Sequence, residues 1–176
     1  GIAILGIGLF WMQKDHYKAY QQWNKAQMFY NNKAYEAALE VYEPLYPLLK
    51  HKPEFLFEAA QSLSKTGQYE KANEYLERAV LLSSDPMLYY VMAKNEQCLG
   101  EYRQAEKHLL HAIDILPERI YPYYLLMNLY TEPSYFQPAK LKKAIDSVLT
   151  KKPKVESSAI KEMKEKARSM LNNTSI

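Results

Sequence analysis

The chain repeats itself at intervals of 33 and 34 residues, and this repeat constrains its fold more than any other feature. Three stretches align without gaps, at residues 33–45, 67–79 and 100–112. Each has a tyrosine followed three residues later by an alanine; the tyrosines are Tyr35, Tyr69 and Tyr102. Apolar residues recur around these stretches at spacings of three and four, which indicates two amphipathic helices per repeat. Because one repeat cannot bury its apolar face alone, the repeats are predicted to stack into an all-helical solenoid.

Composition narrows the class of protein. Of the 176 residues, 48% are hydrophobic and 24% are charged, which is typical of a globular chain and excludes disorder. Only 5 glycines are present, too few turn formers for a fold of many strands. The single cysteine, Cys98, can form neither an internal disulfide nor a cysteine-based zinc site. The net charge of +3 is too small to favour a nucleic-acid partner.

The repeat resembles the tetratricopeptide repeat, which has a small residue where its two helices approach and Gly-x-Tyr at the turn. The small position is occupied by Ala26, Ala60 and Ala93. The turn glycines are Gly67 and Gly100, and Lys33 stands in place of glycine in the first repeat. The resemblance implies an all-α superhelix of about four helix pairs, with an apolar helical extension at the start and a capping helix at the end.

The resemblance also implies a division of the chain. An apolar helix is expected at residues 1–18, four repeats over 19–153, and a capping helix with a tail at 154–176. The repeats are expected at 19–52, 53–85, 86–119 and 120–153. The fourth repeat has a longer turn that holds Pro133 and Pro138. The expected cap carries an apolar stripe made of Ile160, Met163, Ala167, Met170 and Leu171.

The first twelve residues are apolar throughout, but a helix needs about 20 such residues to cross a bilayer. No proline or glycine separates Met12 from Asn31, so one helix is predicted from about Ile4 to Asn31. We interpret residues 1–12 as the remnant of a transmembrane segment, with Trp11 at the membrane interface. The alternative is an apolar helix that packs on the repeats or on a second copy of the chain, as a homo-oligomer.

In the tetratricopeptide family the first helices of the repeats line a concave groove, and here those helices carry an aromatic row. The row consists of Trp23, Phe57, Tyr90 and Tyr124. Beside it, one and four residues after the small position, stand the mostly polar side chains Gln27, Tyr30, Gln61, Lys94, Gln97 and Asn128. These spacings place both rows on one helix face. They predict a groove for a protein or peptide segment, or for a glycan, because aromatic rings pack on apolar groups and sugars while amides bond to peptide backbone or hydroxyls.

Part of the aromatic row can instead belong to the core. Trp23 is open to either interpretation, since the family's large core residue usually stands one position earlier, where this chain has Gln22. Tyr89 and Tyr123 are expected to fill that core position in the third and fourth repeats. This leaves Tyr90 and Tyr124 for the groove.

No residue looks catalytic. His108 and His111 are three residues apart on one expected helix, but no third ligand is tied to them, so we expect no metal site. Cys98 has no histidine partner at a spacing that supports nucleophilic chemistry. Phosphate loops and hydrolase motifs are absent from the sequence, so we expect neither a cofactor nor enzyme activity in this chain.

An apolar segment that leads directly into tyrosine-rich repeats is similar to the C-terminal tails of O-antigen ligase or polymerase family proteins from Bacteroidetes. Stretches such as YEPLYPLL and YPYYLLMNLY carry this resemblance. In that family a polytopic membrane part moves glycan from a lipid carrier, and the repeats are an appendage. The resemblance implies attachment to the bacterial inner membrane and a scaffold role in lipopolysaccharide and surface polysaccharide assembly. The alternative is a membrane-anchored adaptor or chaperone-like assembly factor that binds peptide segments.

Overall fold

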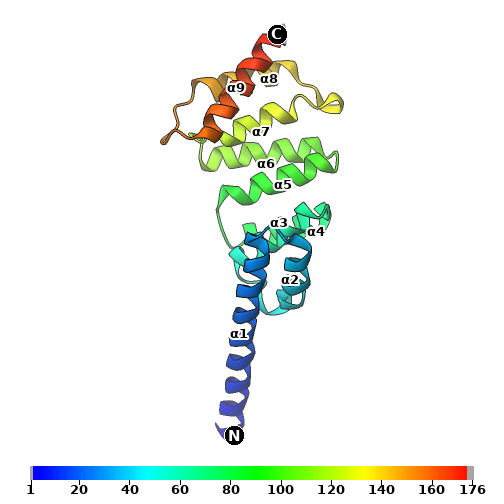
Figure 1. Ribbon diagram of the computed structural model, residues 1–176, viewed down its shortest axis with the longest axis vertical. Helices are drawn as coiled ribbons and strands as arrows, with labels where there is room; N and C mark the ends of the chain where they lie inside the picture. The colour runs from blue at the N-terminus through cyan, green and yellow to red at the C-terminus, as the bar shows by residue number, and fades with distance from the viewer. Residues whose placement is uncertain (1, 174–176) are drawn as a thin grey trace. The chain divides into compact units, whose positions relative to one another are not determined.

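The computed structural model describes the backbone of residues 2–173 and the side chains of residues 13–172. All regular elements of this part of the chain are helices (Figure 1). They are α1 (Ile2–Asn31), α2 (Tyr35–Leu49), α3 (Pro53–Lys65), α4 (Tyr69–Val80), α5 (Pro86–Cys98), α6 (Tyr102–Ile115), α7 (Tyr121–Leu129), the 3-10 turn η1 (Pro133–Tyr135), α8 (Pro138–Thr150) and α9 (Ser158–Asn173). The predicted all-α fold of paired helices is confirmed.

The turns inside the first three helix pairs share one backbone conformation. Gly67 and Gly100 have positive φ angles of 80° and 78°, and Lys33 adopts φ 60° at the equivalent place. The residue after each of them donates its backbone N–H to a carbonyl five residues earlier, as Gln68 does to Leu63 at 2.9 Å. This is the bond that closes a helix end with a left-handed residue, and glycine adopts that conformation without steric cost. The sequence prediction of a special turn at Gly100 is confirmed.

The chain divides into two compact units, Gly1–Ser84 and Asp85–Ile176. In the first, α1 pairs with α2 and α3 pairs with α4. Ala26 and Ala60 are fully buried, as expected of the small positions where paired helices approach. Larger buried side chains fill the remaining space: Tyr42, Leu49, Phe55, Leu56, Leu63 and Leu76.

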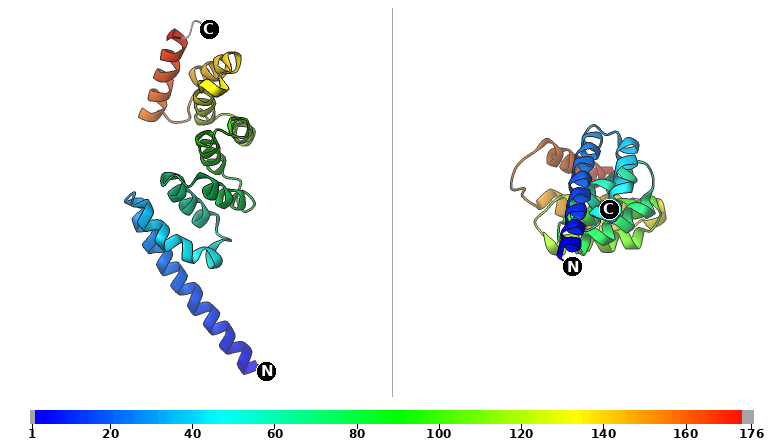
Figure 2. Two further views of the ribbon diagram at one scale, coloured as in Figure 1. Left: turned by 90° about the vertical axis from the view of Figure 1, so that its right-hand side faces the viewer. Right: turned by 90° about the horizontal axis from the view of Figure 1, so that it is seen from below.

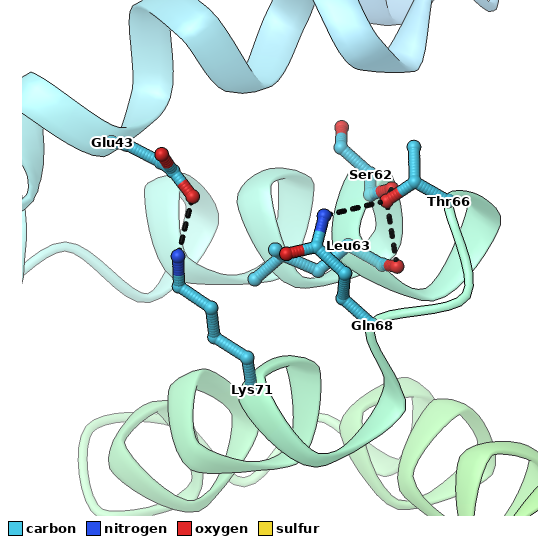
Figure 3. Close-up of polar contacts among 6 residues, drawn as sticks. All are labelled: Glu43, Ser62, Leu63, Thr66, Gln68 and Lys71. Carbon is cyan, nitrogen blue, oxygen red and sulfur yellow. Dashed lines mark hydrogen bonds and ion pairs between the residues drawn. The ribbon is translucent and has the colours of Figure 1, made fainter.

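Polar contacts secure the surface of this first unit (Figure 3). An ion pair between Lys71 and Glu43 joins α4 to α2. The Thr66 hydroxyl donates to the backbone carbonyls of Ser62 and Leu63 and accepts from the Gln68 amide, so it caps the end of α3. The Thr66 hydroxyl thus adds a side-chain donor at carbonyls of the last turn of α3, which also accept backbone N–H groups.

The helix α1 runs without a break for 30 residues, which confirms the continuous helix predicted from the absence of breakers. Figures 1 and 2 show that its first half projects beyond the other helices of its unit. Within the residues described, none of the helices combines the length and apolarity needed to cross a bilayer.

In the second unit, α5 pairs with α6 and α7 pairs with α8, while α9 packs mainly on α8. The core includes Tyr90, Ala105, Leu109, Leu126, Met127, Leu129, Ile145 and Val148. Ala167 of α9 is fully buried in this core, and Ile160, Met163 and Met170 pack against it as the sequence stripe predicts. Leu171, the fifth residue of the predicted stripe, is instead 37% exposed. Lys164 donates to the carbonyls of Leu149 and Lys151, at 3.3 Å and 2.9 Å, and so caps the carboxyl end of α8. The repeat boundaries given above stay predictions.

Candidate functional site

Three helices of the first unit converge on one carboxylate, Glu58 of α3. The Trp23 indole N–H donates to Glu58 Oε2 at 2.7 Å, and the Gln27 amide donates to Oε1 at 2.8 Å, both from α1. The Tyr42 hydroxyl of α2 donates to Oε2 at 3.0 Å. We call these four residues the Glu58 cluster. It holds the two α1 side chains in fixed positions beside α3.

A second contact joins α1 to α3 on the same face. The Tyr30 hydroxyl donates to the side-chain oxygen of Gln61. The structure thus brings together Trp23, Gln27, Tyr30 and Gln61, four of the residues predicted for the groove. Phe57 is half-buried on α3, four residues before Gln61 and so on the same side of that helix. We call these five predicted residues the α1–α3 face.

Trp23 has both an apolar and a polar contact, which explains why its sequence position is ambiguous. Its ring meets Phe55 edge-on with centroids 5.7 Å apart, and Phe55 in turn packs on Tyr42. Its indole N–H bonds to Glu58. One edge of the ring therefore contacts the core while the side chain stays half-buried.

The electrostatics around Glu58 keep the hydroxyls of Tyr42 and Tyr30 as donors. Burial, and then the nearby Glu58 charge, raise the pKa of Tyr42 far above its ordinary value. The same two causes, with Tyr35 as a third, raise the pKa of Tyr30. In the part of the chain that the structure describes, no ion pair reaches Glu58. Its carboxylate is held by neutral donors alone.

The predicted groove residues of the second unit have mixed surroundings. Tyr90 is only 4% exposed and packs edge-on against Tyr121, so its ring is a core side chain. Burial is also the main cause that raises its pKa. The expectation that Tyr89 would fill this core position was wrong, because Tyr89 is half-buried and packs its ring on His108 and His111.

The other predicted residues of this unit are spread over its surface and its interior. Lys94 is exposed, and the Gln97 amide donates to Glu132 at 2.6 Å. The Tyr124 ring lies 5.4 Å from Lys166 Nζ of α9. Asn128 has a buried side-chain oxygen to which no described residue donates. The structure does not gather these residues as it gathers those of α1 and α3, and their part in a ligand site stays a prediction.

A second carboxylate, Glu106 of α6, collects donors in this unit. It accepts from the hydroxyls of Tyr130 and Tyr135 at 2.6 Å and 2.7 Å and from Lys140 Nζ at 2.7 Å. Burial acts to raise its pKa, but the three hydrogen bonds and the Lys140 charge together hold it below its ordinary value. Burial and the Glu106 carboxylate raise the pKa of Tyr130 and of Tyr135. We call these four residues the Glu106 cluster.

His108 has a partner that sequence reasoning missed. Its Nδ1 lies 2.9 Å from the carboxylate of Glu96, which is buried on α5. His111 instead meets the Tyr89 ring edge-on at 4.7 Å. Among the described residues, no group of three or more histidine, cysteine or acidic side chains is arranged to hold a metal ion.

Comparison with known proteins supports the fold. The family model for the anaphase-promoting complex (cyclosome) subunit 3 matches residues 31–112. Mouse tetratricopeptide repeat protein 21A is 35% identical over 86 residues, which are 49% of this chain and 6% of the mouse protein. This chain therefore spans a small part of that curated relative.

Solved structures also support the fold. MamA from Desulfovibrio magneticus RS-1 matches with a TM-score of 0.68 at 19% identity, over 90% of this chain and 98% of the MamA chain. The Yersinia enterocolitica type III secretion chaperone SycD, in complex with a peptide of the translocator YopD, matches with a TM-score of 0.52 at 17% identity, over 85% and 92%. These likenesses show a tetratricopeptide-type fold.

Proposed function

We propose that this chain is a non-catalytic scaffold that binds an extended segment of a partner protein on the α1–α3 face. The observation that carries the proposal is the Glu58 cluster, because it fixes Trp23 and Gln27 before any ligand arrives. Side chains that are already ordered lose less conformational entropy on binding. The SycD chaperone, whose fold is similar, was solved with a bound peptide, which supports this class of ligand.

The chemistry of the face suits an extended peptide. Phe57 and the ring of Trp23 offer apolar surface, and the amides of Gln27 and Gln61 can donate to and accept from a peptide backbone. Half-buried aromatic side chains are the usual anchors of protein interfaces. A glycan is the alternative ligand, since sugar rings pack on the same aromatic surfaces.

The test begins with peptides selected from a random library on the full chain. Replacing Phe57 by alanine is expected to weaken binding of a selected peptide by about 1–2 kcal/mol, measured by calorimetry. Phe136→Ala, which changes a half-exposed ring of the second unit, is the matched control and should leave binding unchanged. A Phe57→Ala chain that binds normally, or that loses about 3–5 kcal/mol of stability as a core residue would, contradicts the proposal.

We further propose that residues 1–12 attach the chain to the bacterial inner membrane, as the appendage of an O-antigen ligase or polymerase protein in surface polysaccharide assembly. The support is an apolar segment that continues into the first repeat within one helix, α1. The alternative context is a membrane-anchored adaptor or a chaperone-like assembly factor, which the likeness to SycD favours. A reading frame that encodes about ten further apolar spans would support the ligase or polymerase context. A reading frame with a single span would support the adaptor or assembly factor.

Flotation with liposomes tests the membrane attachment. The full chain should float and a chain without residues 1–12 should not. Sedimentation of the same two samples tests whether residues 1–12 join two copies instead: self-association that disappears on deletion, without flotation, would overturn the membrane proposal.

A further inference from the structure

Two shallow cavities meet on the second unit. The first has a volume of about 350 Å³ and lies among α6, α7 and α8, with Ile113, Leu126 and Ala144 among its lining residues. The second has a volume of about 560 Å³ and lies along α6 beside Tyr89. Leu110 and Glu106 line both cavities. The two cavities therefore form one continuous surface.

Leu110 is the exposed apolar side chain at the junction of the cavities. It is 46% exposed, whereas Leu109, the residue that precedes it in the helix, is buried. A single exposed leucine is ordinary on a protein surface. This leucine differs because apolar side chains lie beside it in the first cavity, so that a partner could bury it and them together.

The rim of this surface is basic. Lys140 and Lys143 line the first cavity, and Arg103 and Lys107 line the second. The carboxylates there are Glu106 and Asp114. Glu106 already accepts hydrogen bonds from two tyrosines and from Lys140, so its charge is compensated within the chain. No ion pair is formed by Lys107 or Lys143 in the described part of the chain.

We propose that this α6–α8 surface, centred on Leu110 with Lys107 and Lys143 at its rim, docks an acidic protein segment that places an apolar side chain in the first cavity. An apolar anchor surrounded by carboxylates complements an apolar cavity surrounded by lysines. The hollow among three helices suits an inserted side chain better than a flat lipid surface. The surface uses different helices from the α1–α3 face, so the two binding proposals stand or fall separately.

The probe is a synthetic fluorescein-labelled peptide of glutamate and leucine at helical spacing, and binding to the full chain is measured by fluorescence anisotropy. Two control peptides are also tested. In one, glutamine replaces every leucine, and in the other, lysine replaces every glutamate. The acidic apolar peptide should bind and the other two should bind at least about tenfold more weakly, because the apolar anchor and the charge both contribute. Added salt should weaken binding further.

Matched variants locate the site. Leu110→Ala and Lys143→Glu should each weaken binding of the acidic peptide by about fivefold or more. Leu81→Ala, at a leucine that is 83% exposed in the first unit, and Lys65→Glu, at an exposed lysine of α3, should have no effect. Circular dichroism of each variant checks that its helices are intact.

Several results would overturn the proposal. The proposal is wrong if the acidic apolar peptide does not bind, or if the peptide with glutamine in place of leucine binds equally well. It is also wrong if Leu81→Ala and Lys65→Glu weaken binding as much as Leu110→Ala and Lys143→Glu do. Vesicles containing phosphatidylglycerol form a further arm. If they bind the chain through Leu110 and Lys143 while the peptide does not, the surface is a lipid site and the protein-docking proposal is wrong.

Discussion

Each unit of the molecule has one carboxylate that ties several helical elements together, and the two differ in what they accept. Glu58 receives three neutral donors from α1 and α2. Glu106 receives two tyrosine hydroxyls from the α7–η1 segment and the charged Lys140 of α8. Hydrogen bonds from uncharged donors to a carboxylate depend strongly on direction, whereas an ion pair depends more on ionic strength. The first cluster is therefore suited to fixing side-chain positions, and the second to stabilising a long turn.

The largest effect is expected for Glu58→Ala. Removing the carboxylate leaves the donors of Trp23, Gln27 and Tyr42 without their acceptor in a partly buried site, at a cost of about 2–4 kcal/mol in the free energy of unfolding. Urea denaturation measures it. Glu40→Ala, which changes an exposed carboxylate on α2, is the control and should cost little. A loss no larger than that of the control would show that the cluster does not hold the helices.

Gly100→Val is expected to come next, with a loss of about 1–3 kcal/mol. A cavity or clash is not the cause, because nothing lies within 4 Å of the place where a Cβ would stand. The cost arises from φ 78°, which a β-branched residue adopts poorly. An unchanged urea midpoint would disprove this account of the turn.

Glu106→Gln should cost about 1–2 kcal/mol near neutral pH, because it removes the charge that Lys140 pairs with. The pKa of Glu106 is lowered in the folded chain, so the folded state binds fewer protons than the unfolded state near the ordinary value of 4.5. The contribution is therefore complete above that pH and is lost as the pH falls through the lower folded-state value. The melting temperatures of the unchanged chain and of Glu106→Gln, measured from neutral to acid pH, should converge at the acid end. A difference in melting temperature that stays constant with pH would contradict the ion pair.

The smallest effect is expected for Lys33→Gly, and its sign is opposite. Lys33 adopts φ 60°, which costs a residue with a side chain more than it costs glycine. Glycine also raises the entropy of the unfolded chain, so the net gain should be about 0.5 kcal/mol. The same change at the exposed Lys142, in the interior of α8, should destabilise the chain instead. A loss of stability at position 33 would show that the lysine side chain contributes there.

Features that recur in the sequence predicted the fold. The alanines at 26, 60 and 93 and the turn residues at 33, 67 and 100 recur at the repeat interval, and each has the burial or backbone angle that its position requires. The absence of breakers after Met12 predicted the continuous helix α1. These properties depend on local sequence and spacing, which a single chain displays.

Features that occur once were not predictable. Glu58 and Glu106 stand at positions that hold other residue types in the other repeats, and several of their donors lie 24 to 35 residues away in sequence. Adjacent aromatic residues posed a second difficulty. Tyr89 and Tyr90 are neighbours on α5, and the rotation of that helix on its neighbours decides which of the two is buried. The predicted residues on α1 and α3 are therefore brought together, whereas those on α5 and α7 are not.

We propose that α1 and α3 together form a peptide-binding face. Hydrogen–deuterium exchange of the full chain, measured with and without a peptide selected from the library, tests it most directly. We predict slower exchange on binding in residues 20–31 of α1 and 53–65 of α3, with the exchange of α6 and α8 unchanged. Protection confined to α6 and α8, or protection that persists undiminished in the Phe57→Ala chain, would contradict the claim.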